Sequence, residues 1–471
     1  MPDILIKNGL LVTAEDSFEG DLLIADGVIA RLGEAITRPG AHVIDAGGMI
    51  VMPGGVDAHT HLNLTVGKNK VCDGFYEGSA AAAFGGTTCV VEHPAFGPDG
   101  CGLLHQVRAY QKEAAGACVV DFGIHGVFQH VSEQILDDIE TLMAHGVSSA
   151  KIYLTYAGRL TDEQILSVLA RAKTAGVLAA FHAENHAIID FLCRRFIAEG
   201  KHSPKYHALS RPPYCEAEAV YRIIALAEAV GDVPVYIVHL STQAGLEIIE
   251  SARDRGLPVV AEVCPQHLLL EDACYVTPDH KGLQYIMAPP ARKAADRAAL
   301  WQGLSRGSID VVATDHCSFS FADKLAQGKD DFSRCPGGVP GVETRLALLF
   351  SEGVLPGRIS LNRFVDVVST APARLMGLFP QKGNLAPGAD ADVVILDPNL
   401  EKTITPDILR QNADYSPFEG RRVRGWPVVT IVRGRVVVQQ EALLVEKGWG
   451  QYIRRKRAVL HRPNQGGTHA K

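Results

Sequence analysis

Two histidines spaced two residues apart could bind a metal ion near residue 60 of this chain. They are His59 and His61, within the segment DAHTH at residues 57–61. In an extended chain, side chains at positions i and i+2 point to the same side, so both imidazoles can reach one ion. The pair alone also fits two partly buried structural histidines, so its meaning depends on the other candidate ligands.

Three further candidate ligands each stand at the end of an apolar run. His182 follows VLAAF, His239 follows PVYIV, and Asp315 follows IDVVAT. If these runs are neighbouring parallel strands, their carboxyl ends meet at one rim, where these side chains and the histidine pair would converge. Nitrogen and oxygen donors suit Zn²⁺ or a similar divalent ion. For each histidine taken singly, a hydrogen-bonded core residue remains the plain alternative.

Lys151 is a charged residue at the start of the apolar stretch KIYLTY. An unpaired ammonium inside a barrel core is costly, so we expect its pKa to fall toward that of a neutral amine. A neutral amine can capture CO₂, and the resulting carbamate has two oxygens that could bridge two cations. The alternative is a lysine whose side chain reaches the rim and stays charged.

The elements that must position these residues alternate between short apolar runs and longer segments of helical periodicity. Continuous apolar runs indicate strands covered on both faces, and interleaved helices indicate parallel crossovers. One such helix begins at a capping box formed by Thr161 and Gln164 and ends at Gly176. The pattern predicts an eight-stranded α/β barrel, (β/α)8, over residues 52–376. The eight runs are IVMPGGVDAH, TTCVVEH, CVVDFGIHG, SSAKIYLTY, VLAAFHAEN, PVYIVHLS, PVVAEVCPQ and IDVVATDHC.

The two ends of the chain have a different texture. Residues 1–51 contain short β-branched runs joined by the turn dipeptides Asn8-Gly9 and Asp26-Gly27, and residues 377–440 repeat this pattern. We expect the two segments to pair in an accessory β-sandwich. Residues 441–471 are basic and lack apolar periodicity. We expect them to pack on the body of the protein or on a neighbouring subunit, with an anionic ligand site as the other interpretation.

Composition limits the classes of partner. The chain has 471 residues, of which 47% are hydrophobic, and 46 Lys and Arg against 53 Asp and Glu give a net charge of −7. This mild acidity argues against a nucleic-acid partner. No apolar run approaches the length that would span a membrane. The ten cysteines are scattered without a CxxC pair, which is typical of buried thiols in a reducing compartment, so we expect a cytoplasmic protein.

Long motifs along nearly the whole chain resemble those of the cyclic amidohydrolases of the dihydropyrimidinase and hydantoinase family, with the bacterial D-phenylhydantoinases as the most similar branch. This family lies within the amidohydrolase superfamily. The motifs are VMPGGVDAHTH, KIYLTY, FHAEN, YHALSRPP, YIVHLS, VATDHCSFS, DFSRCP, PGVETR and KGNLAPGADADVVILD.

The resemblance implies two divalent metal ions per subunit and a homotetramer. Zn²⁺ is the expected metal, with Mn²⁺ or Co²⁺ as alternatives. The resemblance also implies that CO₂ carboxylates Lys151 and that the modified lysine bridges the ions. The implied ligands are His59, His61 and Asp315 on one ion, and His182 and His239 on the other.

The same resemblance assigns roles at the substrate. Tyr156 would donate a hydrogen bond to the developing oxyanion, although a core aromatic at the barrel mouth is the alternative. Family members commonly have Ser and Asn at the positions of Ala288 and Gly337, where they hold the amide edge of the ring. In this chain, the main chain at Ala288 and Gly337 would have to supply those contacts. If recognition requires polar side chains instead, the substrate ring differs from hydantoin or dihydropyrimidine.

The expected reaction is hydrolytic ring opening of a small cyclic amide. A metal-bridging hydroxide would open a 5-substituted hydantoin or a dihydropyrimidine to an N-carbamoyl amino acid or a ureido acid, with Asp315 carrying the proton. Another ring, such as allantoin or a cyclic imide, is the nearest alternative, and a non-catalytic scaffold is the remote one. Asn63 replaces the arginine that dihydroorotases use to bind a carboxylate, and the HxE and PCxxC motifs of zinc deaminases are absent.

Overall fold

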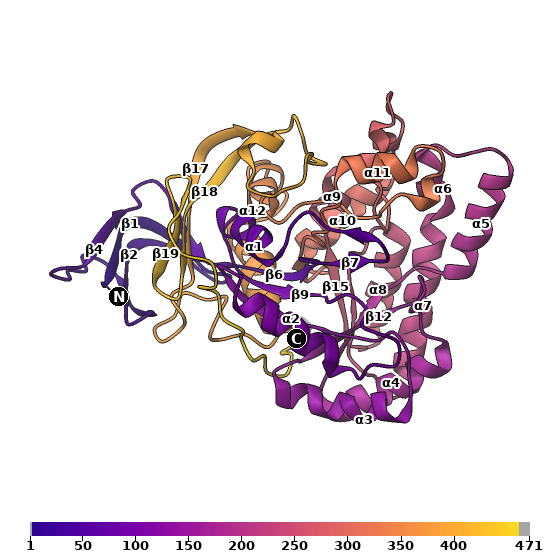
Figure 1. Cartoon of the computed structure of the whole chain (residues 1–471). Coiled ribbons are helices and arrows are strands. Elements are labelled where there is room, and N and C mark those ends of the chain that lie inside the picture. The colour runs from indigo at the N-terminus through magenta and orange to yellow at the C-terminus, as the bar shows by residue number, and fades with distance from the viewer. Residues whose placement is uncertain (1, 461–471) are drawn as a thin grey trace, which may run out of the picture.

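Eight parallel strand positions form a ring at the centre of the molecule. The computed structural model describes residues 2–460, and Figure 1 shows this ring surrounded by helices, with a separate sheet on one side. Each strand pairs in parallel with the next in the chain. The strands are β6 (Gly55–Thr60), β9 (Thr87–Glu92), β10 (Asp121–Ile124) with its continuation β11 (Gly126–Val127), β12 (Ser149–Tyr153), β13 (Leu178–His182), β14 (Val235–Ile237), β15 (Val259–Val263) and β16 (Val311–Val312).

The ring closes at two places where backbone bonds join its two sheets. The His125 amide, between β10 and β11, donates to the carbonyl of Glu92 on β9 at 2.8 Å. On the other side, the Asp315 amide donates to the His59 carbonyl at 2.9 Å, and Thr60 forms a parallel bridge with His316. The predicted α/β barrel is therefore confirmed.

Helices cover the outside of the ring, and α4 shows the local signals that set their bounds. The Thr161 hydroxyl accepts from the Gln164 amide and the Gln164 side chain bonds back, as the sequence predicted, and Gly176 ends the helix at φ 75°. No helix in residues 2–460 is long and apolar enough to cross a membrane. The helices before β16 are α1 (Phe75–Phe84), α2 (Leu104–Ala115), α3 (Glu133–Leu142), α4 (Asp162–Ala175), α5 (His186–Ala198), α6 (Lys205–Ser210), α7 (Pro213–Ala229), α8 (Gln243–Asp254), α9 (Pro265–Leu269) and α10 (Ala294–Arg306). Those after it are α11 (Phe321–Gly328), α12 (Arg345–Leu349), α13 (Leu361–Val365) and α14 (Ala371–Leu375).

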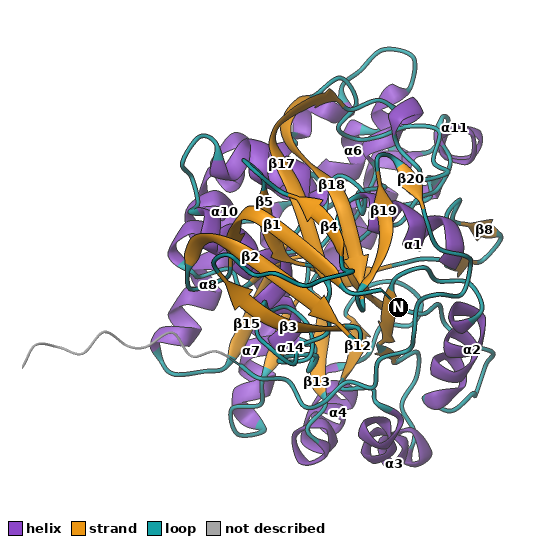
Figure 2. Ribbon diagram, turned by 90° about the vertical axis from the view of Figure 1, so that its left-hand side faces the viewer, coloured by secondary structure: helices purple, strands orange, loops and turns teal. Residues whose placement is uncertain are grey.

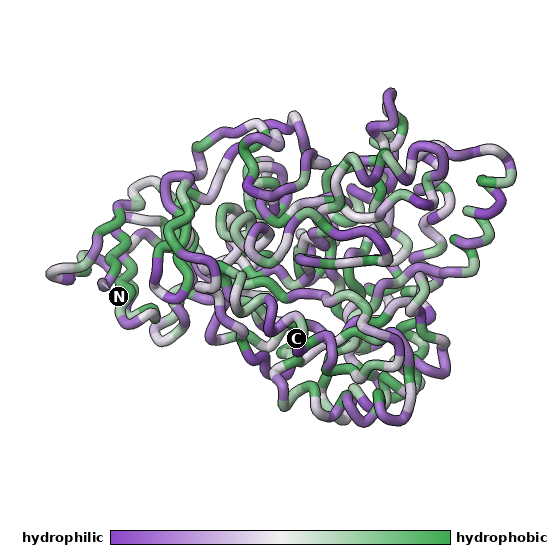
Figure 3. Tube along the Cα trace, in the orientation of Figure 1, coloured by the Kyte–Doolittle hydropathy of each residue, from purple (hydrophilic) through white to green (hydrophobic). Residues whose placement is uncertain are grey.

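The two ends of the chain meet in one nine-stranded sheet, seen face-on in Figure 2. Strand β17 runs antiparallel to β5, with Val393 opposite Pro53, which confirms the predicted pairing of the ends. This sheet buries its own apolar cluster, and Figure 3 shows hydrophobic residues along it and along the barrel strands. Its strands are β1 (Ile4–Val12), β2 (Ser17–Ala25), β3 (Val28–Gly33), β4 (His42–Asp45), β5 (Ile50–Pro53), β17 (Val393–Thr403), β18 (Arg422–Val432), β19 (Arg435–Gln439) and β20 (Ala442–Leu443). A separate hairpin, β7 (Thr65–Val66) with β8 (Asn69–Lys70), follows β6.

The basic C-terminal segment packs on the body of the chain as far as residue 460. Its backbone bonds to the region before β10 and β12, where the Arg455 amide donates to the Gly146 carbonyl at 2.9 Å. The Arg455 side chain is buried and donates to the Ser149 hydroxyl at 2.8 Å and the Ile124 carbonyl at 2.6 Å. The packing predicted for this segment is confirmed for residues 441–460, and residues 461–471 lie outside the described part.

A buried ion cluster joins the sheet to the barrel. The Lys382 ammonium lies 2.7 Å from Asp121, 3.0 Å from Asp390 and 2.9 Å from Asp392, and Arg433 pairs with Asp121 at 3.0 Å. Three carboxylates this close could hold a metal ion, but the ammonium already lies among them and compensates their charge.

We predict that Lys382→Met lowers the free energy of unfolding by about 3–5 kcal/mol, because it leaves buried carboxylates without their cation. Chemical denaturation measures this change. Lys293→Met is the matched control, because Lys293 pairs with Asp272 at 2.9 Å on the surface, and we expect this substitution to change the free energy of unfolding little. Equal effects of the two substitutions would contradict the prediction.

Candidate metal centre

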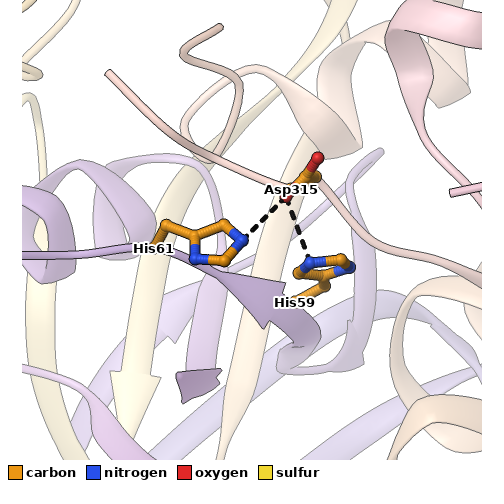
Figure 4. A group of neighbouring side chains, drawn as sticks. All are labelled: His59, His61 and Asp315. Atoms are coloured by element: carbon orange, nitrogen blue, oxygen red, sulfur yellow. Dashed lines mark ion pairs between the residues drawn. The ribbon is translucent and has the colours of Figure 1, made fainter. Parts of the chain in front are cut away.

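His59, His61 and Asp315 meet at the carboxyl end of the barrel, as Figure 4 shows. His59 lies near the end of β6, and Asp315 follows β16. The Nε2 atoms of both histidines lie 3.1 Å from the same Oδ1 of Asp315. Burial alone would raise the pKa of Asp315, but the two histidines hold it well below the usual range. The carboxylate is thus ionised and shared by two imidazoles.

Lys151, on β12, points into this cluster. Its Nζ lies 3.2 Å from Nε2 of His59, and the residue is 1% exposed. Burial lowers the pKa of Lys151 to about 8, in the direction expected from the sequence. Only acidic groups at longer range, chiefly Asp315, oppose this fall.

His182 and His239 complete the group of imidazoles. His182 ends β13, His239 follows β14, and their ring centroids are 4.6 Å apart. The His239 ring is in turn 5.5 Å from that of His59. Burial lowers the pKa of His182, and lowers that of His239 well below the usual range. Both rings therefore favour the neutral form, which is the form that ligates metals.

The hydrogen-bond pattern fits a divalent cation. Nδ1 of His59 lies 2.8 Å from the carboxylate of Glu262, so a neutral His59 ring carries its proton there and presents a lone pair at Nε2. That lone pair faces the ionised Oδ1 of Asp315. Burial alone would lower the pKa of His59, but the carboxylates of Asp315 and Glu262 raise it, so this position favours a positive charge, which a proton or a cation can supply. Imidazole nitrogen with carboxylate oxygen suits zinc. The six side chains predicted as ligands therefore lie near one another, and three of them, His59, His61 and Asp315, form a cluster that could hold a metal ion.

Three residues of the site have strained backbone conformations. Tyr156, His239 and Asp315 are not glycines, yet their φ angles are 70°, 40° and 51°. Each such conformation costs about 1–3 kcal/mol and persists only where the surroundings enforce it. In these three residues the strained backbone lies at the rim, where it directs side chains toward the shared centre.

Tyr156 lies at the mouth of the cluster. Its ring centroid is 5.1 Å from that of His182, and the guanidinium of Arg211 lies 5.8 Å from the ring. The residue is 40% exposed, so it is not the fully buried core aromatic of the alternative interpretation. Partial desolvation raises the pKa of Tyr156, so its hydroxyl stays protonated and can donate a hydrogen bond.

Ala288 and Gly337 lie in two loops that meet beside the Asp315 loop. The Gly338 amide donates to the Ile286 carbonyl at 3.0 Å, and the Gly337 carbonyl accepts from the Cys317 thiol at 3.9 Å. A Cβ atom on Gly337 would meet no atom within 4 Å. The space beside Gly337 is open, which leaves its main chain accessible.

Sequence reasoning missed two carboxylates that hold the candidate ligands. Glu262 accepts from His59, and Glu184 lies 2.8 Å from Nε2 of His182 while also pairing with Arg211. Burial alone would raise the pKa of Glu184, but Arg211 and His182 lower it to about 2. A signal for both was present in the sequence, since Glu184 stands two residues after a strand-end histidine and Glu262 interrupts the apolar run VVAEV.

Comparisons with known proteins agree with this geometry. The model of the amidohydrolase family matches residues 50–437. The chain belongs to the amidohydrolase family. It is 49% identical to a D-phenylhydantoinase of Escherichia coli O1:K1 / APEC, over 96% of this chain and 98% of that protein. The predicted resemblance is therefore confirmed.

Solved structures of family members share the whole fold. A dihydropyrimidinase from Brevibacillus agri NCHU1002 is 38% identical with a TM-score of 0.95, covering 98% of this chain and 100% of that one. An L-hydantoinase (dihydropyrimidinase) from Arthrobacter aurescens is 33% identical with a TM-score of 0.88, covering 96% and 99%. This member of the amidohydrolase family thus resembles proteins named for hydantoin and dihydropyrimidine chemistry along its full length.

We predict that Gly337→Ala leaves stability unchanged within about 0.5 kcal/mol, because the added methyl group enters open space. Gly338→Ala is the matched contrast, since its φ is 147° and its Cβ would lie 2.7 Å from the Cys317 carbonyl oxygen. It should cost about 1–3 kcal/mol through overpacking. Denaturation midpoints of both variants test this pair, and a destabilised Gly337→Ala would show that the space is not open.

Proposed function

We propose that this protein is a metal-dependent hydrolase that opens cyclic amides, namely 5-substituted hydantoins or dihydropyrimidines, to N-carbamoyl amino acids or ureido acids. The observation that carries the proposal is the meeting of Lys151 with His59 and Asp315 at the barrel rim. Among the described residues, 2–460, no carboxylate lies within ion-pairing distance of the buried Lys151 amine, so an ordinary buried ion pair does not explain its place there. The relatives named for this chemistry match over nearly the whole chain.

Six side chains would hold a pair of divalent ions, with zinc expected and manganese or cobalt as alternatives. His59, His61 and Asp315 would bind one ion, His182 and His239 the other, and Lys151, carboxylated by CO₂, would be shared. When bound, such ions lower the pKa of water from about 15.7 toward 7 and polarise a carbonyl group.

The chain's own residues move the proton and stabilise the charge. As water adds to the amide carbon, the Asp315 carboxylate takes one of its protons and then returns it to the ring nitrogen as the C–N bond breaks. The Tyr156 hydroxyl donates to the oxygen on which negative charge develops. The main chain at Ala288 and Gly337 would hold the amide edge of the ring, since neither residue offers a polar side chain.

Ring identity and handedness need a substrate panel. Relatives named as D- and L-hydantoinases both share this fold, and allantoin or a cyclic imide is the alternative substrate. Ring opening by zinc-loaded protein should be assayed with both enantiomers of phenylhydantoin. Dihydrouracil, allantoin and succinimide complete the panel. Turnover of none of them by protein that contains both ions would overturn the function and favour the scaffold.

We also propose that the protein forms a homotetramer. Four large apolar side chains on neighbouring helices are more than half exposed, and a second copy of the chain could cover them. They are Phe191 on α5, Leu209 on α6, and Tyr214 and Tyr221 on α7. Light scattering coupled to gel filtration measures the oligomeric state.

We also propose domain bounds and a cellular compartment for the protein. We place the two parts of the β-sandwich at residues 1–51 and 377–440, the barrel at 52–376 and the extension at 441–471; the separate apolar cluster of the sheet supports this division. A reducing compartment such as the cytoplasm suits the ten cysteines, all of which are unpaired thiols.

We predict that Lys151→Ala loses metal and activity, because the bridge between the ions disappears. Millimolar propionate or another short carboxylic acid should restore part of both. Metal content by elemental analysis and hydantoin turnover measure the result. Lys324→Met is the control, because Lys324 is equally buried but donates to the Ile286 carbonyl at 2.8 Å. We expect the Lys324→Met protein to retain both ions. Full metal content in Lys151→Ala would refute the bridge.

We predict that Tyr156→Phe retains the metal ions and reduces kcat by about 10²–10³, the usual cost of one lost oxyanion donor. KM should change little, because the hydroxyl acts on charge that develops in the transition state. Steady-state kinetics with elemental analysis check both statements. An unchanged kcat would remove Tyr156 from the mechanism.

A further inference from the structure

Glu262, on β15, is a buried carboxylate that touches two candidate ligands at once. The residue is 0% exposed. Its Oε1 accepts from Nδ1 of His59 at 2.8 Å and from the backbone amide of His239, also at 2.8 Å. Its Oε2 accepts from the hydroxyl of Tyr236. One oxygen atom thus contacts residues from β6 and from the loop after β14.

We propose that Glu262 is a positioning residue that holds the two metal sites in fixed relation to each other. The proposal rests on the proposed function, in which His59 and His239 bind different ions. A shift of this carboxylate would move ligands of both sites together. Glu262 itself touches neither ion.

The bond to His59 sets which nitrogen can bind metal. A neutral imidazole carries one proton, and the acceptor at Nδ1 places that proton there and leaves Nε2 free to ligate. A carboxylate in this position also increases the basicity of the ligand nitrogen, as in other carboxylate–histidine–metal arrangements. Nε2 then points toward Asp315, 3.1 Å away.

The bond to His239 acts on the backbone instead. His239 has a φ of 40°, which a residue with a side chain adopts only when its surroundings enforce it. The charged acceptor at 2.8 Å binds the amide of this residue and so stabilises the turn that aims its imidazole at the centre.

The charge of Glu262 distinguishes it from an ordinary buried ion pair. Within residues 2–460, His59 is the only basic side chain within ion-pairing distance of it. Glu184 offers a contrast, because it contacts His182 and is compensated by Arg211. The negative charge of Glu262 is therefore available to balance the cations that its partners would bind.

The test compares metal binding by Glu262→Gln, Glu184→Gln and Tyr236→Phe in the full-length protein. Glu262→Gln retains an acceptor oxygen and the shape of the side chain but removes the charge. We expect it to bind zinc about 10–100-fold more weakly at both sites, measured by competition with a chelator. Glu184→Gln should weaken one site only, and Tyr236→Phe neither. Cobalt-loaded protein adds a second readout, since its absorption spectrum reports the ligand geometry of each ion.

Several outcomes separate this proposal from the function on which it rests. Wild-type affinity at either site in Glu262→Gln, with unfolding unchanged, would overturn the positioning role and leave the hydrolase intact. Wild-type protein that binds no zinc would overturn the proposed function itself. If Glu262→Ala does not fold, Glu262→Gln still decides, and Glu262→Asp should recover only part of the affinity because its shorter side chain cannot reach both partners.

Discussion

A lysine amine buried beside a histidine nitrogen is the constraint on which the rest of this site depends. Desolvation favours an uncharged amine, while the ionised Asp315 nearby favours a positive charge in the same space. In the function proposed above, carboxylation of Lys151 would convert the amine into an anionic ligand, and the bound cations would supply the positive charge beside Asp315. The chemistry of the site follows from the way the barrel buries this one side chain.

Two buried carboxylates hold three of the candidate ligands. Glu262 binds His59 and the backbone of His239, and Glu184 binds His182. A barrel is suited to this arrangement because neighbouring strand ends point to the same rim, so a carboxylate on one strand can reach ligands from others. Glu262 also stabilises the strained backbone of His239, while the Asp315 amide donates to the His59 carbonyl at 2.9 Å.

Periodicity predicted the strands, the crossover helix α4 and the residues at the strand ends, because these depend on local patterns of apolar residues and caps. The candidate ligands could be found for the same reason, since the histidines and Asp315 follow apolar runs and Lys151 begins one. Glu262 was missed, because its position in an apolar strand is a signal that names no partner until the fold brings His59 and His239 to it. For the basic segment, packing on the body was expected, but the burial of Arg455 depends on contacts with the region before β10 and β12 that the sequence does not show.

The placement of Arg455 extends support for the centre to the opposite end of the barrel. Its guanidinium donates to the hydroxyl of Ser149, which bonds to Nδ1 of His125 at 2.7 Å. The His125 ring stacks on that of His93 at 3.8 Å, and His93 packs 4.3 Å from His59. This chain of contacts begins in the C-terminal segment and ends at a candidate metal ligand. Because packed interiors transmit displacement, the C-terminal segment that contains Arg455 helps to define the position of His59.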